Sequence, residues 1–230
     1  MQLLRSLLFS LLFYPGTLLF VLAGIVAGAI GTPTMLKVVY GWAHFHHWIA
    51  KSLLGIDTRI EGAVPPGAYL IAVKHQSMFE TIEMLLVARI PIIVLKRELA
   101  DLPLFGRLTR RYGVIPVDRE AGAKALRDML ADAKAAKASG RPVVIYPEGT
   151  RVAPGTTPPL RAGFAGMYRA LGLPVVPVAT ESGRLFRRGL VKRSGTIRFL
   201  VGEIIPAGLK REEIEQRVHS AINALEFSAS

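Results

Sequence analysis

A histidine and a carboxylate five residues apart, His75 and Glu80, form the pair in this chain best suited to moving a proton. The apolar, β-rich run 68–73 before them is typical of a buried strand. Ser77 and Glu80 have capping-box spacing, which predicts a helix that begins at Ser77. Residues five apart on one helix diverge by about 140°, so the pair converges only if His75 lies in the preceding turn. Glu80 would then hold one ring nitrogen while the other serves as a general base.

The same residues also have a purely structural interpretation. Glu80 would complete the helix cap by bonding to the Ser77 backbone, and His75 would be a polar turn residue. With five His and 17 acidic residues in 230, this spacing arises by chance roughly 0.4 times, so the pattern alone is weak. The choice between a catalytic pair and a cap therefore depends on the rest of the chain.

Composition points to an anionic, apolar partner. The 29 Lys and Arg residues exceed the 17 Asp and Glu residues, for a net charge of +12, which suits nucleic acid, a membrane surface or phosphorylated metabolites. With 51% hydrophobic residues, a mean hydropathy of +0.37 and no nucleic-acid-binding signature, the chain favours anionic membrane lipid over nucleic acid. The absence of cysteine excludes a disulfide framework, a thiolate nucleophile and a cysteine-based zinc site.

The N-terminal segment is apolar and predicts membrane attachment. No charged side chain occurs between Arg5 and Lys37, and the run 7–30 would reach about 36 Å as one helix. Pro15-Gly16 interrupts this run, so a single spanning helix and a hairpin in one leaflet, divided at Pro15-Gly16, both remain open. Ala27-Gly28-Ala29 resembles a signal-peptide cleavage site, but the apolar run is long for such a peptide.

The segment 35–54 predicts an interfacial helix. Tyr40, Trp42 and Trp48 form an aromatic belt of the kind found at bilayer surfaces. Three histidines also occur there, but the segment contains no carboxylate or cysteine, so we predict a polar helix face and no metal site. Residues 1–55 are therefore interpreted as a membrane anchor with an interfacial helix, and residues 56–230 as one further domain.

From residue 56 onward, apolar strand-like runs alternate with helical stretches. The expected strands are 69–73, 91–95, 113–117, 143–146, 175–179 and 196–201, and the clearest helices are 120–139 and 210–226. This alternation predicts an α/β domain with a single mixed, largely parallel sheet flanked by helices. Loops at the strand ends line the ligand crevice of such sheets. Pro177, within one expected strand, predicts a sheet edge or a bulge.

Two of these loops carry cations. Tyr146-Pro147-Glu148-Gly149-Thr150-Arg151 follows the expected strand 143–146 and offers a guanidinium, a hydroxyl and backbone N–H groups to an anion. Lys96-Arg97-Glu98-Leu99 follows the strand 91–95 and would bring a second cation to the same rim. Taken singly, each stretch also fits an ordinary turn with an exposed basic residue.

Taken in order, these blocks resemble a known enzyme family. The set comprises His75 with Glu80, then Lys96-Arg97-Glu98-Leu99 with Pro103 and Phe105-Gly106, Ile115-Pro116-Val117-Asp118-Arg119, Tyr146-Pro147-Glu148-Gly149-Thr150-Arg151 and Val176-Pro177-Val178. It is similar to the four acyltransferase blocks of the 1-acyl-glycerol-3-phosphate acyltransferase family, over residues 70–180. The first block of that family usually ends in Asp, where this chain has Glu80. A longer carboxylate still reaches the imidazole.

The resemblance implies a reaction and a set of site residues. His75 would be the general base that activates the sn-2 hydroxyl of lysophosphatidate for attack on an acyl thioester carried by coenzyme A or acyl carrier protein (acyl-CoA or acyl-ACP), with no bound cofactor. Glu80 would fix its tautomer. Phosphate binding is implied for Lys96, Arg151, Gly149, Thr150 and Glu148, and weaker contacts with the donor or with lipid for Arg97, Arg107 and Arg119.

Two alternatives to this reaction remain at the level of sequence. The first keeps the chemistry and changes the acceptor to another lysolipid, such as a lysophospholipid or a lyso-aminolipid. The second is a non-enzymatic, basic, membrane-binding protein. Because acyl-CoA is a cytoplasmic donor, the enzymatic interpretation implies a protein associated with the cytoplasmic face of the inner membrane, with anionic lipid and acyl carrier protein as candidate partners.

Overall fold

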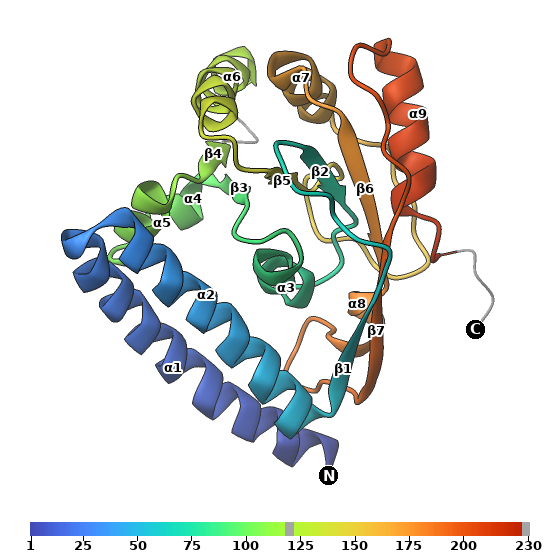
Figure 1. Ribbon diagram of the computed structural model, residues 1–230. Coiled ribbons are helices and arrows are strands. Elements are labelled where there is room, and N and C mark those ends of the chain that lie inside the picture. The colour runs from blue at the N-terminus through green and yellow to red at the C-terminus, as the bar shows by residue number, and fades with distance from the viewer. Residues whose placement is uncertain (118–121, 227–230) are drawn as a thin grey trace.

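A computed structural model describes residues 1–117 and 122–226, and its centre is one seven-stranded sheet in the order β1-β7-β6-β2-β5-β3-β4 (Figure 1). All strand pairs are parallel except the antiparallel pair β6–β7. The strands are β1 (Ile56–Glu61), β2 (Leu70–Val73), β3 (Ile92–Lys96), β4 (Ile115–Val117), β5 (Val143–Ile145), β6 (Val175–Thr180) and β7 (Gly195–Val201). The predicted single mixed, largely parallel sheet is confirmed, and β1 is the strand that the apolar runs did not mark.

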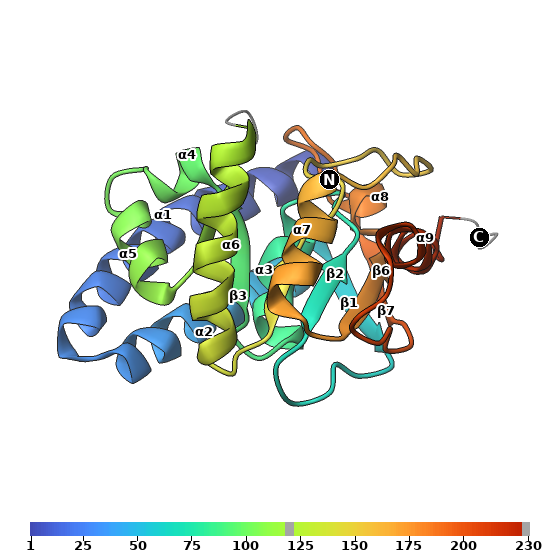
Figure 2. The same ribbon diagram turned by 90° about the horizontal axis from the view of Figure 1, so that it is seen from above.

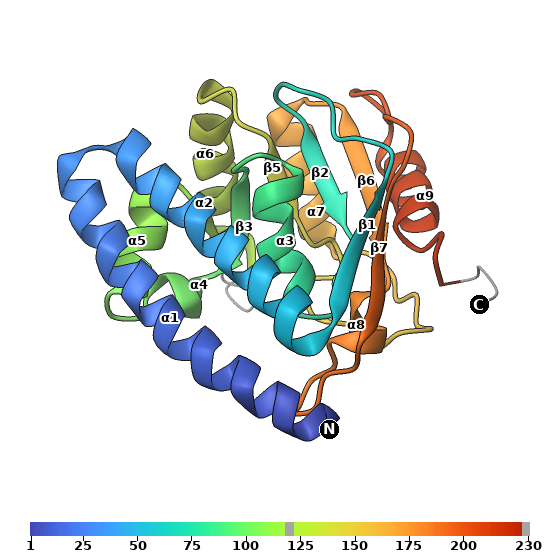
Figure 3. The same ribbon diagram turned by 60° about the horizontal axis from the view of Figure 1, so that its bottom comes forward.

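Helices cover both faces of the sheet. They are α1 (Gln2–Ile30), α2 (Thr32–Ile49), α3 (Phe79–Val87), α4 (Arg97–Ala100), α5 (Phe105–Tyr112), α6 (Gly122–Ala138), α7 (Ala162–Leu171), α8 (Ser182–Leu185) and α9 (Arg211–Ile222), with a π-helical turn η1 (Ala50–Leu54) after α2. Helices α6, α7 and α9 lie on one face and the pair α1–α2 with α3 on the other (Figures 2 and 3).

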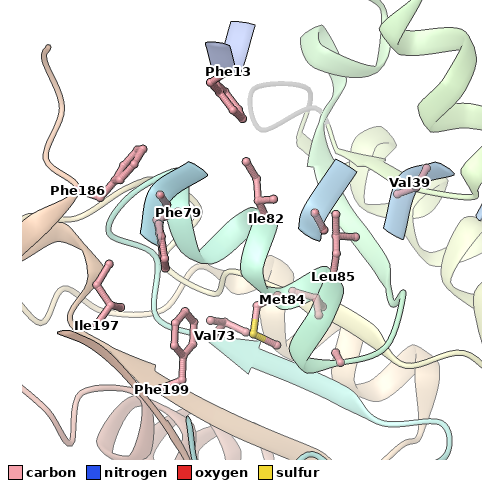
Figure 4. Close-up of a cluster of buried hydrophobic side chains, with 14 of the residues drawn as sticks. Phe13, Val39, Val73, Phe79, Ile82, Met84, Leu85, Phe186, Ile197 and Phe199 are labelled. Carbon is pink, nitrogen blue, oxygen red and sulfur yellow. The ribbon is translucent and has the colours of Figure 1, made fainter. Parts of the chain in front are cut away.

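Successive side chains of the buried strands point alternately into two hydrophobic cores, one on each face of the sheet. In β2, Ile71 and Val73 belong to the core under α1, α2 and α3, while Leu70 and Ala72 belong to the core under α6, α7 and α9. Figure 4 shows how α3 occupies the first of these cores, with Phe79 and Met84 packed between the strands and the N-terminal helices. Because both faces are covered, the central strands are apolar on both sides, which is why their sequences run without polar alternation.

The N-terminal helices form an antiparallel pair whose turn is at Gly31. The predicted interruption at Pro15-Gly16 is wrong, because α1 continues through Pro15. Tertiary contacts hold this stretch against α2: Gly16 lies so close to Phe45 that a Cβ there would meet the ring at 2.6 Å, and Trp42 Nε1 donates a hydrogen bond to Thr17 Oγ1 at 3.0 Å. A helix-interior proline costs a hydrogen bond, and packing of this kind offsets that loss.

The helix pair shares a core with the sheet. Phe9 and Phe13 of α1 and Met35 of α2 belong to the same buried cluster as α3, and Arg5 Nε donates to the Leu53 carbonyl at 2.5 Å. The outer side of α1 is exposed, however, and carries the large apolar side chains Leu3, Leu4, Leu7, Leu8, Leu11, Leu12, Leu18, Leu19, Leu22, Val26 and Ile30. Within the described residues, α1 is the one helix with the length and hydropathy to cross a bilayer.

Pro177 lies in an interior strand, so the predicted sheet edge is wrong. Its carbonyl accepts a hydrogen bond from Gly202 N at 2.9 Å, which shows that the position that lacks an N–H faces β7. On that side the pairing is irregular. Between the pairs Val178↔Val201 and Val175↔Ile205, the segment after β7 has three residues, 202–204, whereas β6 has two, 176–177. The proline is therefore tolerated at a bulge, which was the other position predicted for it.

Candidate functional site

The His75 and Glu80 side chains meet at the carboxyl end of β2. His75 lies in the turn 74–78 and Glu80 in the first turn of α3, and His75 Nδ1 is 2.9 Å from Glu80 Oε1. The carboxylate can only accept, so Nδ1 carries the hydrogen and Nε2 is left with its lone pair when the ring is neutral. The His75 side chain keeps 10% of its surface exposed, while Glu80 is completely buried.

Glu80 accepts five hydrogen bonds, and these include both the cap and the histidine contact. Oε1 accepts from His75 Nδ1 at 2.9 Å and from the backbone N–H groups of Gln76 and Ser77 at 2.8 Å each. Oε2 accepts from the hydroxyls of Ser77 at 2.5 Å and Ser182 at 2.6 Å. The helix itself begins at Phe79 rather than at the predicted Ser77, whose hydroxyl accepts from Phe79 N.

These contacts keep the buried Glu80 carboxylate ionised. Burial by itself would raise its pKa, but hydrogen bonding and charge from His75, and then the Ser182 and Ser77 hydroxyls, hold the pKa below its ordinary value. A carboxylate that stays negative next to an imidazole stabilises the imidazolium form. The arrangement therefore fits a proton acceptor whose cationic state is supported as it forms.

The stretch 146–151, the fourth motif in chain order, borders the histidine. The ring of Tyr146 packs on the His75 ring with centroids 4.4 Å apart, and Val152 N donates to the His75 carbonyl at 2.8 Å. Gly149 has φ 70°, and a Cβ there would meet Arg161 Cγ at 2.9 Å, so the turn requires glycine. Thr150 and Arg151 are exposed beyond this turn. The loop is thus held against His75 by backbone contacts and presents its cation outward.

Glu148 has a different place from the one expected. Its side chain is 1% exposed, Oε1 accepts from His75 N at 3.3 Å, and the Lys74 ammonium is 3.6 Å from the same oxygen. Burial, as the largest cause, raises the pKa of Glu148. Glu148 therefore lies buried against the His75 backbone and Lys74, while Thr150 and Arg151 of the same loop are exposed.

Lys74 is a buried cation that sequence reasoning missed. Nζ donates to the Thr156 carbonyl at 2.7 Å and to Asn223 Oδ1 at 2.5 Å, which ties the residue before His75 to the loop 152–157 and to the end of α9. Burial lowers its pKa, and the charges of Glu148 and Glu226 act in the opposite direction. Its partners come from segments about 80 and 150 positions away, so no local pattern could have indicated the role.

A second group of missed contacts comes from α8 and the C-terminal segment. Gly183 N donates to Gln76 Oε1 at 3.0 Å, and the Gln76 amide group also contacts Glu226. Glu226 in turn accepts from Gly155 N at 2.6 Å. The rule that strand-end loops carry function could have drawn attention to Ser182 and Gly183, which lie just after the end of β6.

Of the remaining predicted cations, three lie on separate elements, namely β3, α4 and α5. Lys96 ends β3, two strands from β2 and so about 10 Å away at the same sheet edge, and pairs with Glu98 at 2.6 Å. Arg97 opens the neighbouring helix α4. Arg107 is exposed on α5, whose Leu108 contacts α1 at Gly24. Arg119 lies outside the described residues.

Lys192 is a cation near Arg151 that was not predicted. Burial lowers the pKa of Lys192, and the charge of Arg151 lowers it further, which places the two groups within electrostatic reach. Nζ lies 4.5 Å from the centroid of the Phe186 ring and donates to the Gly189 carbonyl at 2.7 Å. Lys192 therefore adds a second positive charge close enough to Arg151 to act on it, from the loop after α8.

The histidines of α2 serve an interhelical contact. His46 Nδ1 is 3.3 Å and His47 Nδ1 3.0 Å from the carboxylate of Glu83 on α3. The predicted polar surface face holds for His44, which is exposed, but not for His46, which is completely buried. In residues 1–117 and 122–226, no group of three His, Cys, Asp or Glu side chains is arranged to hold a metal ion.

Comparison with known proteins adds the family context. Residues 56–181 match a family model described as "Acyltransferase". The 1-acyl-sn-glycerol-3-phosphate acyltransferase of Pseudomonas aeruginosa is 31% identical over 217 residues, which cover 90% of this chain and 82% of that protein. The Helicobacter pylori protein of the same name is 35% identical over 101 residues, 44% of this chain and 42% of that protein.

A solved structure shares the fold. The crystal structure of the 1-acyl-sn-glycerophosphate (LPA) acyltransferase, PlsC, from Thermotoga maritima superposes with a TM-score of 0.78 at 18% sequence identity, and the match covers 100% of both chains. Because the match extends over the whole chain, it includes the α1–α2 pair as well as the sheet.

Proposed function

This chain belongs to the acyltransferase family, and we propose that it transfers an acyl chain from an acyl thioester to the sn-2 hydroxyl of 1-acyl-glycerol-3-phosphate, giving phosphatidate. One observation carries the proposal. The imidazole of His75 is bonded through Nδ1 to the ionised, buried Glu80 and has an exposed edge beside the loop that presents Arg151. Relatives named for this acceptor support its choice.

His75 acts as the general base in the proposed reaction. Nε2 takes the proton of the acceptor hydroxyl while the oxygen attacks the thioester carbonyl, and Glu80 stabilises the imidazolium that results. The tetrahedral intermediate then expels the thiolate, and the imidazolium returns the proton to the sulfur, which leaves His75 neutral. A positioned base of this kind contributes about 10²–10⁴ in rate.

The transfer is proposed to be direct, without an acyl-enzyme. The sequence contains no G-x-S-x-G nucleophile elbow and no cysteine. The serines nearest to His75, Ser77 and Ser182, both donate their hydroxyl hydrogens to the Glu80 carboxylate rather than to the imidazole. Acyl-CoA and acyl-ACP present the same thioester to this chemistry, so either can be the donor, and no bound cofactor takes part.

The acceptor phosphate is proposed to bind at the exposed end of the fourth motif. Arg151 supplies a guanidinium for bidentate contact, and the Gly149–Thr150 turn supplies a backbone N–H and a hydroxyl. Lys96 reaches the same sheet edge from β3. Arg97, Arg107 and Arg119 are proposed, more remotely, for the donor's phosphates or anionic lipid.

The lipid substrates give the N-terminal helices a purpose. We propose that residues 1–55 dock the enzyme on the cytoplasmic face of the inner membrane, and that residues 56–230 form the catalytic domain. The outward leucines of α1 are the apolar surface for this contact, since a monomeric soluble protein rarely exposes so long an apolar face. Replacing Leu11, which is 68% exposed, with the uncharged polar residue Ser should weaken co-sedimentation with vesicles without changing folding.

Release of free thiol from acyl-CoA in the presence of lysophosphatidate tests the proposal. Wild-type protein should release thiol, and His75→Ala should lower the rate by at least 10²-fold while the circular dichroism spectrum is unchanged. His44→Ala, on the exposed face of α2, is the matched control and should retain activity. Equal rates for His75→Ala and wild type would refute the role of the base.

A panel of acceptors distinguishes the lysolipid class. With lysophosphatidate as substrate, Arg151→Ala should raise KM more than it lowers kcat, and Arg217→Ala on α9 should change neither. If a lysophospholipid without a terminal phosphate monoester is used faster and Arg151→Ala has no effect, the acceptor is another lysolipid. If no acceptor gives thiol release but salt-sensitive vesicle binding persists, the protein is a membrane-binding module.

A further inference from the structure

We propose that Ser182 is a positioning residue for the His75–Glu80 pair, and that its hydroxyl fixes the longer carboxylate of Glu80 so that the carboxylate faces the imidazole. This role rests on the proposed function, since it acts through the general base. Ser182 lies at the start of α8, separated from β6 by Glu181, and just beyond the residues matched by the family model.

The geometry around Ser182 is that of a dedicated contact. The side chain is completely buried, and Oγ donates to Glu80 Oε2 at 2.6 Å. The hydroxyl of Ser77, which lies between His75 and Glu80 in the sequence, donates to the same oxygen at 2.5 Å. Oε2 is therefore held by two hydroxyls, one from the turn of the pair itself and one from a segment 102 positions away in the chain.

The division of the hydrogen bonds explains why the second hydroxyl matters. Oε1 receives three N–H groups, from His75, Gln76 and Ser77, and all three belong to the same short turn. A glutamate has one more rotatable bond than the aspartate usual at this position of the motif. Ser182 is the one contact in this set from outside the segment 75–80, so it fixes the carboxylate relative to the sheet rather than only to its own turn.

The backbone of α8 is itself fixed close to the turn. Gly183 N donates to Gln76 Oε1 at 3.0 Å, and a Cβ on Gly183 would lie 2.8 Å from Gln76 Cβ. A side chain larger than hydrogen at position 183 would therefore push α8 away. This close approach places Ser182 within hydrogen-bond distance of Glu80, so the sequence pair Ser182-Gly183 supplies both the donor and the room for it.

Loss of the Ser182 hydroxyl should change the pH dependence and the rate of the reaction, and not only the stability of the protein. Without Ser182, Oε2 keeps one hydroxyl donor, the carboxylate becomes more basic, and the imidazolium paired with it becomes more stable. The acidic limb of the kcat/KM profile, where the base becomes protonated, should shift to higher pH. The loss of orientation acts on kcat: the carboxylate is no longer fixed relative to the sheet, so the imidazole is less well aligned with the acceptor hydroxyl, and a fall in kcat of about tenfold is expected.

The experiment compares Ser182→Ala with Ser139→Ala in the thiol-release assay. Ser139 is an exposed serine after α6 whose hydroxyl bonds only locally: it donates to the Ala136 carbonyl and accepts from Arg141 N. Ser182→Ala should lower kcat about tenfold with KM for both substrates within about twofold, and should shift the acidic limb. Ser139→Ala should match wild type. A Ser182→Ala enzyme with wild-type kcat and an unchanged limb would overturn the inference.

A double-mutant cycle separates positioning from general structure. In Glu80→Asp the carboxylate is shorter by one carbon–carbon bond of about 1.5 Å and no longer reaches Ser182, so adding Ser182→Ala should cost less than about twofold. A full tenfold loss in that background would show that Ser182 acts elsewhere.

Two outcomes keep the tests distinct. If Ser182→Ala does not fold, Ser182→Cys, which has similar size and a weak donor, should fold and show a smaller loss of kcat in the same direction; wild-type kcat in that variant would overturn the inference. If wild-type protein releases no thiol with any lysolipid, the proposed function itself has failed, whereas an active wild type with an indifferent Ser182 contradicts the positioning role alone.

Discussion

Replacing Glu80 with Gln tests the electrostatic part of the site most directly. The amide is nearly isosteric with the carboxylate, so its oxygen can still accept at the Oε1 position from His75, Gln76 and Ser77, while the Ser77 and Ser182 hydroxyls can turn to accept from the amide nitrogen. The fold should therefore survive. What is lost is the negative charge that stabilises the imidazolium of His75.

The size of the effect follows from the contact distance. Nδ1 and Oε1 are 2.9 Å apart, so the centres of the two delocalised charges are about 4 Å apart, and at an effective dielectric constant of about 20 their attraction is about 4 kcal/mol. At about 1.4 kcal/mol for each factor of ten, Glu80→Gln should lower kcat by about 10³-fold. KM for the acceptor should change little, because the contacts proposed for its phosphate are made by other residues.

Thiol release measured from pH 5 to 9 gives the result, with Glu203→Gln, an exposed substitution far along the chain, as the matched control. The acidic limb of kcat/KM should also move to lower pH in Glu80→Gln, because the imidazolium loses its counter-charge. An enzyme within tenfold of wild type and with an unmoved limb would refute the reasoning, since it would show that the buried charge does not act on the base.

Three further predictions concern the support of the site. Gly149→Ala should lower the free energy of unfolding by about 1–2 kcal/mol, because φ 70° is costly for alanine and Arg161 is in the way, and thermal melting should show a lower Tm. An unchanged Tm would mean that the turn relaxes freely. Glu226→Gln should lower kcat several-fold with little change in KM, because its new amide hydrogens face the donor group of Gln76; steady-state kinetics check this, and a raised KM alone would contradict it. Glu83→Gln should lower Tm at pH 7. Burial opposes ionisation of Glu83, but the hydrogen bonds and charges of His46 and His47 hold its pKa below 4.5, so this stabilisation is present above pH 4.5 and is lost as the pH falls through the pKa of the folded state. The Tm difference from wild type should close in acid, and a constant difference would point to packing instead.

Local patterns predicted most of the frame correctly. The apolar run before His75 became β2, and the amphipathic stretch 210–226 contains α9, whose Ile214, Val218 and Ile222 are buried as the periodicity requires. Capping-box spacing located the turn between β2 and α3 to within two residues. These features depend on neighbours in the sequence, which is the range over which propensity and periodicity operate.

The errors came from contacts between distant segments. Pro15 does not break α1 because α2 packs against Gly16 and Thr17, and Pro177 sits inside the sheet because β7 is bulged opposite it. The inward position of Glu148, against Lys74 and the His75 backbone, was likewise not indicated by local spacing. Each outcome depends on a partner at least 20 positions away, which local spacing does not specify.

By itself the sequence determined the types of the reacting groups and their place at a strand end, because the apolar run before His75 and the helix-start pattern after it depend only on neighbouring residues. Only the tertiary structure decided what holds that carboxylate ionised and oriented. Ser182 bonds to the carboxylate, and Lys74 and Glu226 hold the turn around it. These residues come together because β6, β2 and β5 are neighbours in the sheet, although they are not consecutive in the chain. Electrostatic stabilisation of a buried charge depends on such through-space neighbours, and they become neighbours only when the sheet has formed.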